Sequence, residues 1–137
     1  MTITGGCLCG DVRYEIREQP KLIEYCHCRT CRRAVGAPIM AWVGVSLKGF
    51  KFNTSGVTSY ASSEGVRRSF CGRCGTSLTI FSEEFPDDIY VSVASLDDPN
   101  SMPPEIHIWR SHRLDWFDTS DELPRFVRFK SDGETEA

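Results

Sequence analysis

Cysteine spacing is the feature of this 137-residue chain that most constrains its fold. The seven cysteines fall into a C-x-C pair, a C-x-C-x2-C cluster and a C-x2-C pair: Cys7/Cys9, Cys26/Cys28/Cys31 and Cys71/Cys74. One or two intervening residues let a turn bring both sulfurs onto one metal ion, at about 2.3 Å from zinc. Such near neighbours seldom have the geometry of a disulfide. The spacing therefore predicts metal binding.

A disulfide framework is the weaker interpretation of the same cysteines. Their number is odd, and Met1–Gly6 contains neither the basic nor the apolar region of a secretory signal. Small disulfide-rich domains belong to oxidising compartments. We therefore expect reduced, metal-binding thiolates in a cytoplasmic protein.

Seven thiolate ligands divide most simply into four and three. We call the two sets the four-cysteine group and the three-cysteine group: Cys7, Cys9, Cys71 and Cys74, and Cys26, Cys28 and Cys31. Four thiolates complete a tetrahedral zinc, so the first site would be structural. Three thiolates leave one position free, as catalytic zinc sites do. The spacing also permits other pairings, such as Cys26 and Cys28 with the last pair.

Composition indicates a folded domain. Hydrophobic residues make up 40% of the chain and charged residues 26%. A chain of this length usually forms one domain, predicted over residues 1–130, with a polar tail at 131–137 that is expected to fray. The net charge of −3 argues against a nucleic-acid partner. The longest mostly apolar run, Ala37–Val45, is too short to span a membrane.

Short runs of β-branched and aromatic residues, separated by turn residues, dominate the rest of the chain. The predicted strands are Asp11–Ile16, Pro38–Leu47, Phe50–Asn53, Thr58–Ala61, Val66–Cys71, Ser77–Phe81 and Ile89–Ala94. A short helix is expected at Arg29–Val35. The predicted fold class is mainly β, with twisted antiparallel sheets of short strands and zinc knuckles.

Six arginines lie close in sequence to the cysteines. Three surround the three-cysteine group: Arg29, Arg32 and Arg33. The other three lie around the last cysteine pair: Arg67, Arg68 and Arg73. Nearby cations stabilise thiolates. The arginines are consistent with ordinary surface residues on turns, and equally with a site that binds the carboxylates of an anionic substrate in bidentate fashion.

The three histidines are weaker candidates. His27 is the middle residue of C-x-C, and we expect its side chain to point away from the metal. His107 alternates with Ile106 and Ile108, which favours a hydrogen-bonded structural role in a strand. His112, in a basic turn, is expected to be exposed.

The order of these motifs resembles the family of glutathione-dependent formaldehyde-activating enzymes, which share their domain with centromere protein V. The matching segments are Gly5–Gly10 followed by the strand Val12–Ile16, Cys26–Arg33, Phe70–Thr76, His107–Trp109 and Trp116–Phe117. They are distributed over nearly the whole chain, and the seven cysteines have the family's order and grouping.

The resemblance implies a β-tent fold with two zinc sites per chain. It assigns a structural zinc to the four-cysteine group and a second zinc to the three-cysteine group, whose cysteines would be the catalytic positions. It also implies that glutathione engages the second site and that its sulfur adds to formaldehyde, giving S-hydroxymethylglutathione. The chain would then be a carbon–sulfur lyase. The same site could serve another small thiol or another aldehyde.

Two other functions stay open at this point. The chain could be a zinc-stabilised binding module without turnover, or a redox or metal-handling protein whose three-cysteine group loses zinc on oxidation. An open pocket beside this group would favour the lyase, whereas a second zinc capped by a protein side chain would favour the binding module.

Overall fold

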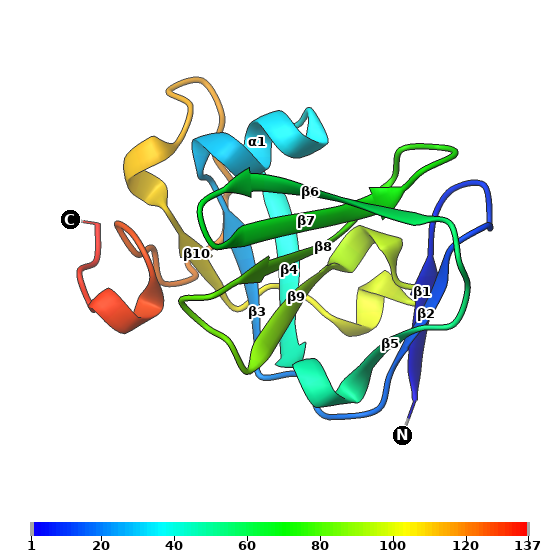
Figure 1. The fold of residues 1–137 in the computed structure, drawn as a ribbon. Helices are drawn as coiled ribbons and strands as arrows, with labels where there is room; N and C mark the ends of the chain where they lie inside the picture. The colour runs from blue at the N-terminus through cyan, green and yellow to red at the C-terminus, as the bar shows by residue number, and fades with distance from the viewer. Residues whose placement is uncertain (1, 137) are drawn as a thin grey trace.

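Short strands dominate the computed structural model, which describes residues 2–136 (Figure 1). The strands are β1 (Ile3–Gly6), β2 (Arg13–Ile16), β3 (Leu22–Cys26), β4 (Met40–Ser46), β5 (Phe50–Phe52), β6 (Val57–Ser63), β7 (Val66–Cys71), β8 (Ser77–Ser82), β9 (Asp88–Ser92) and β10 (Ile106–Ile108). The α-helix is α1 (Arg29–Val35), and short 3₁₀ turns occupy Leu47–Gly49, Val93–Ser95, Pro99–Ser101, Arg110–His112 and Lys130–Asp132.

The strands form two sheets. The smaller has the order β1-β2-β5 and the larger the order β10-β3-β4-β9-β8-β7-β6. In Figure 1 the smaller sheet lies at one end of the molecule, and β10 with the C-terminal segment lies at the other. This arrangement confirms the prediction of a mainly β fold built from short strands.

One strand pair departs from the predicted antiparallel pattern. β10 runs parallel to β3, with Ile106 opposite Glu24 and Ile108 opposite Cys26. Parallel strands need a long connection between them. The segment between β3 and β10 is long enough to let β10 return to the free edge of β3. The other strand pairs are antiparallel, as predicted, and this pair is the parallel exception among the described strands.

Sequence analysis also missed β1 and β3. Two glycines in β1 weaken the strand signal, since glycine is uncommon in strand interiors. Gly5 is required there because a Cβ atom at this position would lie 2.3 Å from the hydroxyl oxygen of Tyr14. That hydroxyl lies 2.6 Å from Ser95 Oγ, in a hydrogen bond that ties β2 to the turn after β9.

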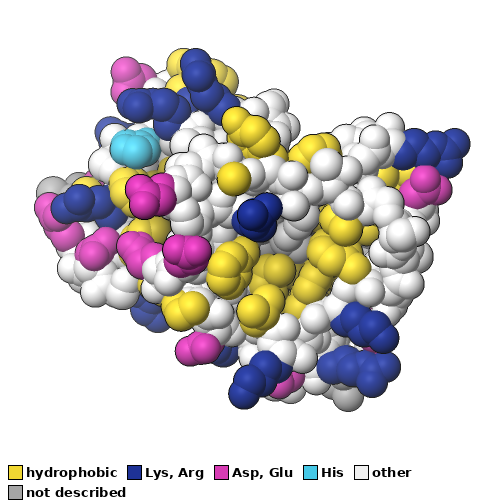
Figure 2. Space-filling view, in the orientation of Figure 1, with side chains coloured by type: hydrophobic (Ala, Val, Ile, Leu, Met, Phe, Trp, Pro, Cys, Tyr) yellow, Lys and Arg dark blue, Asp and Glu magenta, His cyan; other side chains and the backbone are white. Residues whose placement is uncertain are grey.

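Buried side chains form two clusters. The larger lies between the two sheets and includes Val12, Tyr14, Val43, Leu78 and Val91. The smaller includes Cys26, Cys31, Trp42, Ile106 and Ile108, so two of the predicted metal ligands lie in a hydrophobic environment. Figure 2 shows hydrophobic side chains gathered across the middle of one face, between charged side chains on either side.

The segment after β10 folds back on the strand. Phe126 N donates to His107 O at 2.9 Å, Thr135 bridges Phe126, and Glu136 pairs with Arg110 at 3.0 Å. Fraying of residues 131–137 and a domain end at residue 130 remain predictions. Amide hydrogen exchange would test them against these contacts. Among residues 2–136, no helix is long and apolar enough to cross a membrane.

Candidate metal centres and the adjoining pocket

Two turns bring the four-cysteine group together. Cys7 and Cys9 follow β1, Cys71 ends β7, and Cys74 lies in the turn before β8. Their Sγ atoms all lie within 4.8 Å of one another, with 3.6 Å between Cys7 and Cys9 and 3.8 Å between Cys9 and Cys71. Four sulfurs at about 2.3 Å from a tetrahedral zinc would be about 3.8 Å apart. The group therefore fits an ion of this size without rearrangement.

Backbone N–H groups point at these sulfurs. Val12 N donates to Cys7 Sγ at 3.2 Å, and Cys74 N donates to Cys71 Sγ at 3.4 Å. Gly75 makes the second turn possible with a φ of 80°, a conformation that glycine adopts without a steric penalty. Donors aimed at sulfur favour the thiolate form, which is the form that binds metal.

The three-cysteine group lies where β3 meets α1. Cys26 ends β3, Cys28 precedes the helix and Cys31 lies in its first turn, with all three Sγ atoms within 4.8 Å of one another. Cys28 Sγ accepts a hydrogen bond from Cys31 N at 3.3 Å and so caps α1. Hydrogen bonds from the Cys26 and Cys31 thiols lower the pKa of Cys28 to about 2, whereas the pKa values of Cys26 and Cys31 are raised, that of Cys26 chiefly by its contact with Cys28. These features suit Cys28 as a thiolate ligand.

Within residues 2–136 no histidine, aspartate or glutamate joins either sulfur group. The sulfurs gather as four and three, not in the alternative pairing of Cys26 and Cys28 with Cys71 and Cys74. Each group could hold a metal ion.

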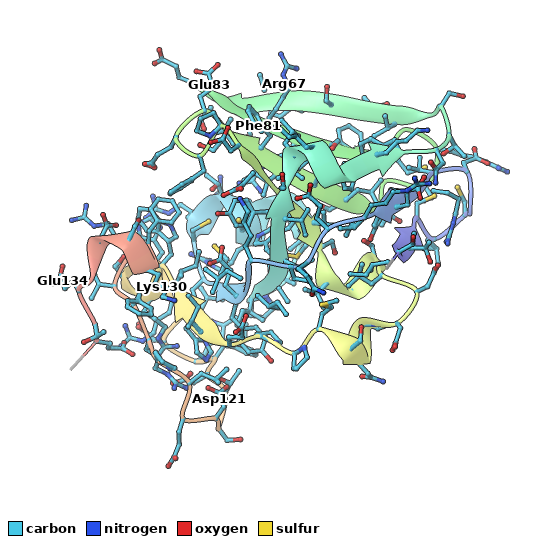
Figure 3. All side chains as sticks on the ribbon, turned by 90° about the horizontal axis from the view of Figure 1, so that it is seen from below. Arg67, Phe81, Glu83, Asp121, Lys130 and Glu134 are labelled. Carbon is cyan, nitrogen blue, oxygen red and sulfur yellow. The ribbon has the colours of Figure 1, made fainter. Side chains whose placement is uncertain are left out.

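Arg68 belongs to the three-cysteine group rather than to the last pair. Its guanidinium reaches Cys31 Sγ at 3.6 and 3.7 Å and donates to Thr30 Oγ1 at 3.1 Å. The predicted location is wrong because successive strand residues face opposite sides of a sheet: Arg68 is 8% exposed, whereas Arg67 points outward near Glu83 (Figure 3). A buried cation thus faces the three thiols.

A chain of buried polar groups supports the C-x-C segment from behind. His27 Nε2 lies 2.8 Å from His107 Nδ1, and His107 Nε2 lies 3.0 Å from Asp121 Oδ1. Both histidines are fully buried, and burial lowers both pKa values, that of His27 to about 4. His107 has the hydrogen-bonded role that was predicted, and His27 is held away from the sulfurs. The residues joined by these hydrogen bonds are far apart in sequence, so no local motif predicted that they would meet.

Replacing Asp121 with asparagine is expected to lower the free energy of unfolding by about 1–2 kcal/mol, because the buried His107 loses a charged hydrogen-bond acceptor. Asp121 lies on the loop after β10, across the molecule from Arg67 (Figure 3). Urea unfolding of metal-loaded protein at neutral pH would measure the change. The exposed neighbour Glu122 provides the control, since Glu122→Gln removes a charge but leaves the hydrogen bonds among His27, His107 and Asp121 in place. Equal stability of Asp121→Asn and the parent would contradict a supporting role.

A cavity of about 280 Å³ opens beside the three-cysteine group. Its walls combine the three sulfurs with aromatic side chains and Arg68: Cys26, Cys28, Cys31, Arg68, Trp42, Phe85, Tyr90, Trp109 and Phe129. A concave site with apolar walls and a few polar groups is typical of a small-molecule pocket. The open pocket is the feature that distinguishes a lyase from a capped binding module.

Trp109 lies in one wall of this cavity, and its own backbone has an uncommon conformation. Its φ of 57° lies in the left-handed region, which a bulky residue rarely adopts. The ring packs against Phe129 and His112, with centroids 5.3 and 4.8 Å apart. His112 is half-buried at this wall, so the prediction that it is exposed is wrong; packing against Trp109 covers it.

Glu24 is the pocket residue that sequence analysis missed. It lies on β3 opposite Trp42 of β4, it is 6% exposed, and burial raises its pKa to about 7. The indole Nε1 of Trp42 is also buried without a hydrogen-bond partner in the described chain. A single glutamate in a hydrophobic run carries no motif, although the alternation of strand residues could have placed Glu24 on the same face as Cys26.

Comparison with known proteins agrees with this geometry. The family model described as glutathione-dependent formaldehyde-activating enzyme matches residues 2–112. The chain belongs to this family.

Two curated relatives and a solved structure are similar to the chain. A Halomonas elongata protein, provisionally named a glutathione-dependent formaldehyde-activating enzyme, is 26% identical over 133 residues, covering 85% of this chain and 80% of its own. An uncharacterized lyase of Schizosaccharomyces pombe is 41% identical over 75 residues, covering 54% of this chain and 53% of its own, about half of its length. A crystal structure of a Rhodobacter sphaeroides protein matches with a TM-score of 0.57 and 24% identity, covering 69% of this chain and 87% of that one, which shows a shared fold.

Proposed function

We propose that this protein is a zinc-dependent carbon–sulfur lyase that reversibly joins glutathione, or a similar thiol, to formaldehyde or a related aldehyde. The observation that carries the proposal is the cavity lined by all three sulfurs of the three-cysteine group. Three protein ligands leave one position of a tetrahedral ion to a substrate. Membership of the family supports the choice of glutathione and formaldehyde.

Zinc fits the donor sets of both groups. The four-cysteine group would hold a structural ion, and Cys26, Cys28 and Cys31 would hold the second. When bound there, zinc would supply positive charge that lowers the pKa of a thiol. The reduced state that these thiolates need supports a cytoplasmic location.

The proposed reaction conserves every atom of both substrates. The sulfur lone pair of glutathione forms a bond to the carbon of formaldehyde, and the π electrons of the carbonyl bond move to its oxygen. The oxygen takes up a proton in place of the one that the thiol has lost. The product is S-hydroxymethylglutathione, and the reverse steps release both substrates without an oxidant or a reductant.

The chain's own residues would contribute charge balance and positioning. Arg68, close to Cys31 Sγ, offsets the negative charge of the thiolates. The aromatic walls limit the access of water, and the cavity keeps two small reactants together, so that their encounter becomes effectively intramolecular.

Exchange NMR spectroscopy tests this function. In a mixture of glutathione and formaldehyde, the rate of interconversion between free and adduct forms should rise linearly with the concentration of zinc-loaded protein. An interconversion rate equal to that in buffer at every protein concentration would overturn the proposal for this pair of substrates.

A further inference from the structure

We propose that Glu24 selects the thiol substrate by binding an ammonium group on it, of the kind that the γ-glutamyl residue of glutathione carries. The inference rests on the proposed function, because it takes a thiol as the molecule that enters the cavity. It assigns a recognition role to a residue outside the cysteine motifs.

The first support is that Glu24 has no partner of its own. Its side chain lines the cavity at 6% exposure, and it makes no side-chain hydrogen bond or ion pair with any of residues 2–136. Its carboxylate oxygens are not among the fully buried atoms without a partner, so they face the open cavity. A molecule that displaces water from this wall would have to supply a donor to them, because burying a carboxylate without a donor is costly.

The second support is that no cation in the described part of the chain pairs with Glu24. Arg68, which also lines the cavity, donates to Cys31, Thr30 and Ser62. Lys21, close in sequence, pairs with Asp88. Arg29 also lines the cavity, and within residues 2–136 none of these three cations forms an ion pair with Glu24. The carboxylate is therefore open to a cationic ligand.

The third support is the aromatic character of the walls. Trp42 lies directly opposite Glu24 on β4, and Tyr90 and Trp109 line the same cavity. The faces of aromatic rings attract ammonium groups, most strongly where water is excluded. A carboxylate among aromatic rings is better suited to an ammonium than to an anion or an alkyl group.

The position of Glu24 also fits a thiol bound at the sulfurs. Glu24 and Cys26 are two residues apart on the same face of β3, which corresponds to about 7 Å along a strand. In glutathione, a flexible chain long enough to cover this distance separates the sulfur from the ammonium. The sulfur can therefore lie at the three-cysteine group while the ammonium contacts Glu24.

A cycle of two proteins and two thiols tests the contact. The proteins are the zinc-loaded parent and Glu24→Gln, which keeps the size of the side chain. The thiols are glutathione and its deaminated analogue, glutaryl-cysteinyl-glycine, which lacks only the ammonium. Dissociation constants are measured by NMR titration without aldehyde. The parent should bind glutathione at least about tenfold more tightly than the analogue, and Glu24→Gln should bind both equally, because the effects of groups in contact are not additive.

The control is Glu122→Gln, which removes an exposed carboxylate away from the cavity and should keep the parent's preference. Equal affinity of the parent for both thiols, or an unchanged preference in Glu24→Gln, would overturn the assignment. The comparison of the two thiols on the parent protein does not depend on whether any variant folds. If the parent accelerates exchange but Glu24→Gln keeps the preference, only this inference fails. If the preference depends on Glu24 but no acceleration occurs, the proposed function fails and the inference stands.

Discussion

Cys71→Ser is expected to leave the protein largely unfolded or aggregated. Cys71 is 1% exposed, and its group joins the turn after β1 to the turn after β7, so it links the two sheets. Structural zinc contributes about 10–16 kcal/mol in zinc-finger peptides, which is comparable with the about 5–15 kcal/mol stability of a whole domain. Losing one ligand of such a site would therefore remove most of the folding free energy.

Soluble yield and far-UV circular dichroism in the presence of zinc would measure this effect. Cys28→Ser supplies the matched control, because it makes the same chemical change in the other group. A Cys71→Ser protein as stable as the parent would show that the four-cysteine group does not hold a structural metal.

Cys28→Ser is expected to give a folded protein with about one zinc per chain instead of two. Cys28 is half-buried at the cavity, and it is one of three cysteines in a group that joins no two sheets. Its second role, capping α1, is one that serine performs well. The helix should therefore survive while the metal is lost.

Two measurements test the expectation for Cys28→Ser: metal content by mass spectrometry and the free energy of unfolding in urea. The four-cysteine group should keep its zinc in this variant, so the unfolding transition should stay cooperative. Two bound zinc ions per Cys28→Ser chain would contradict the assignment of this cysteine as a ligand.

Local spacing made much of the fold and the site predictable. The sulfur groups follow from tight turns, α1 begins and ends where predicted, and β7 has the predicted bounds Val66–Cys71. For the three-cysteine group and α1 the determining interactions lie within a few residues, so the sequence pattern and the structure depend on the same contacts. The four-cysteine group joins turns that are distant in sequence, and the division of seven thiolates into four and three predicted it.

The other features that depend on distant segments could not be predicted. Arg68 meets Cys31 and His107 meets His27 only because separate strands are brought together. The same holds for the cavity, whose walls come from β3, α1, β4, β6, β7, β8, β9, β10 and the segment after β10. Glu24 gains its character from burial, which is a property of the assembled sheet and not of the residues beside it.

The most direct test compares glutathione–formaldehyde exchange rates for the parent and for folded Cys28→Ser at equal protein concentrations. We expect that the parent accelerates interconversion and that Cys28→Ser returns the rate to that of buffer while keeping its four-cysteine zinc. Equal acceleration by both proteins would contradict chemistry at the three-cysteine group, and no acceleration by the parent would contradict the lyase itself.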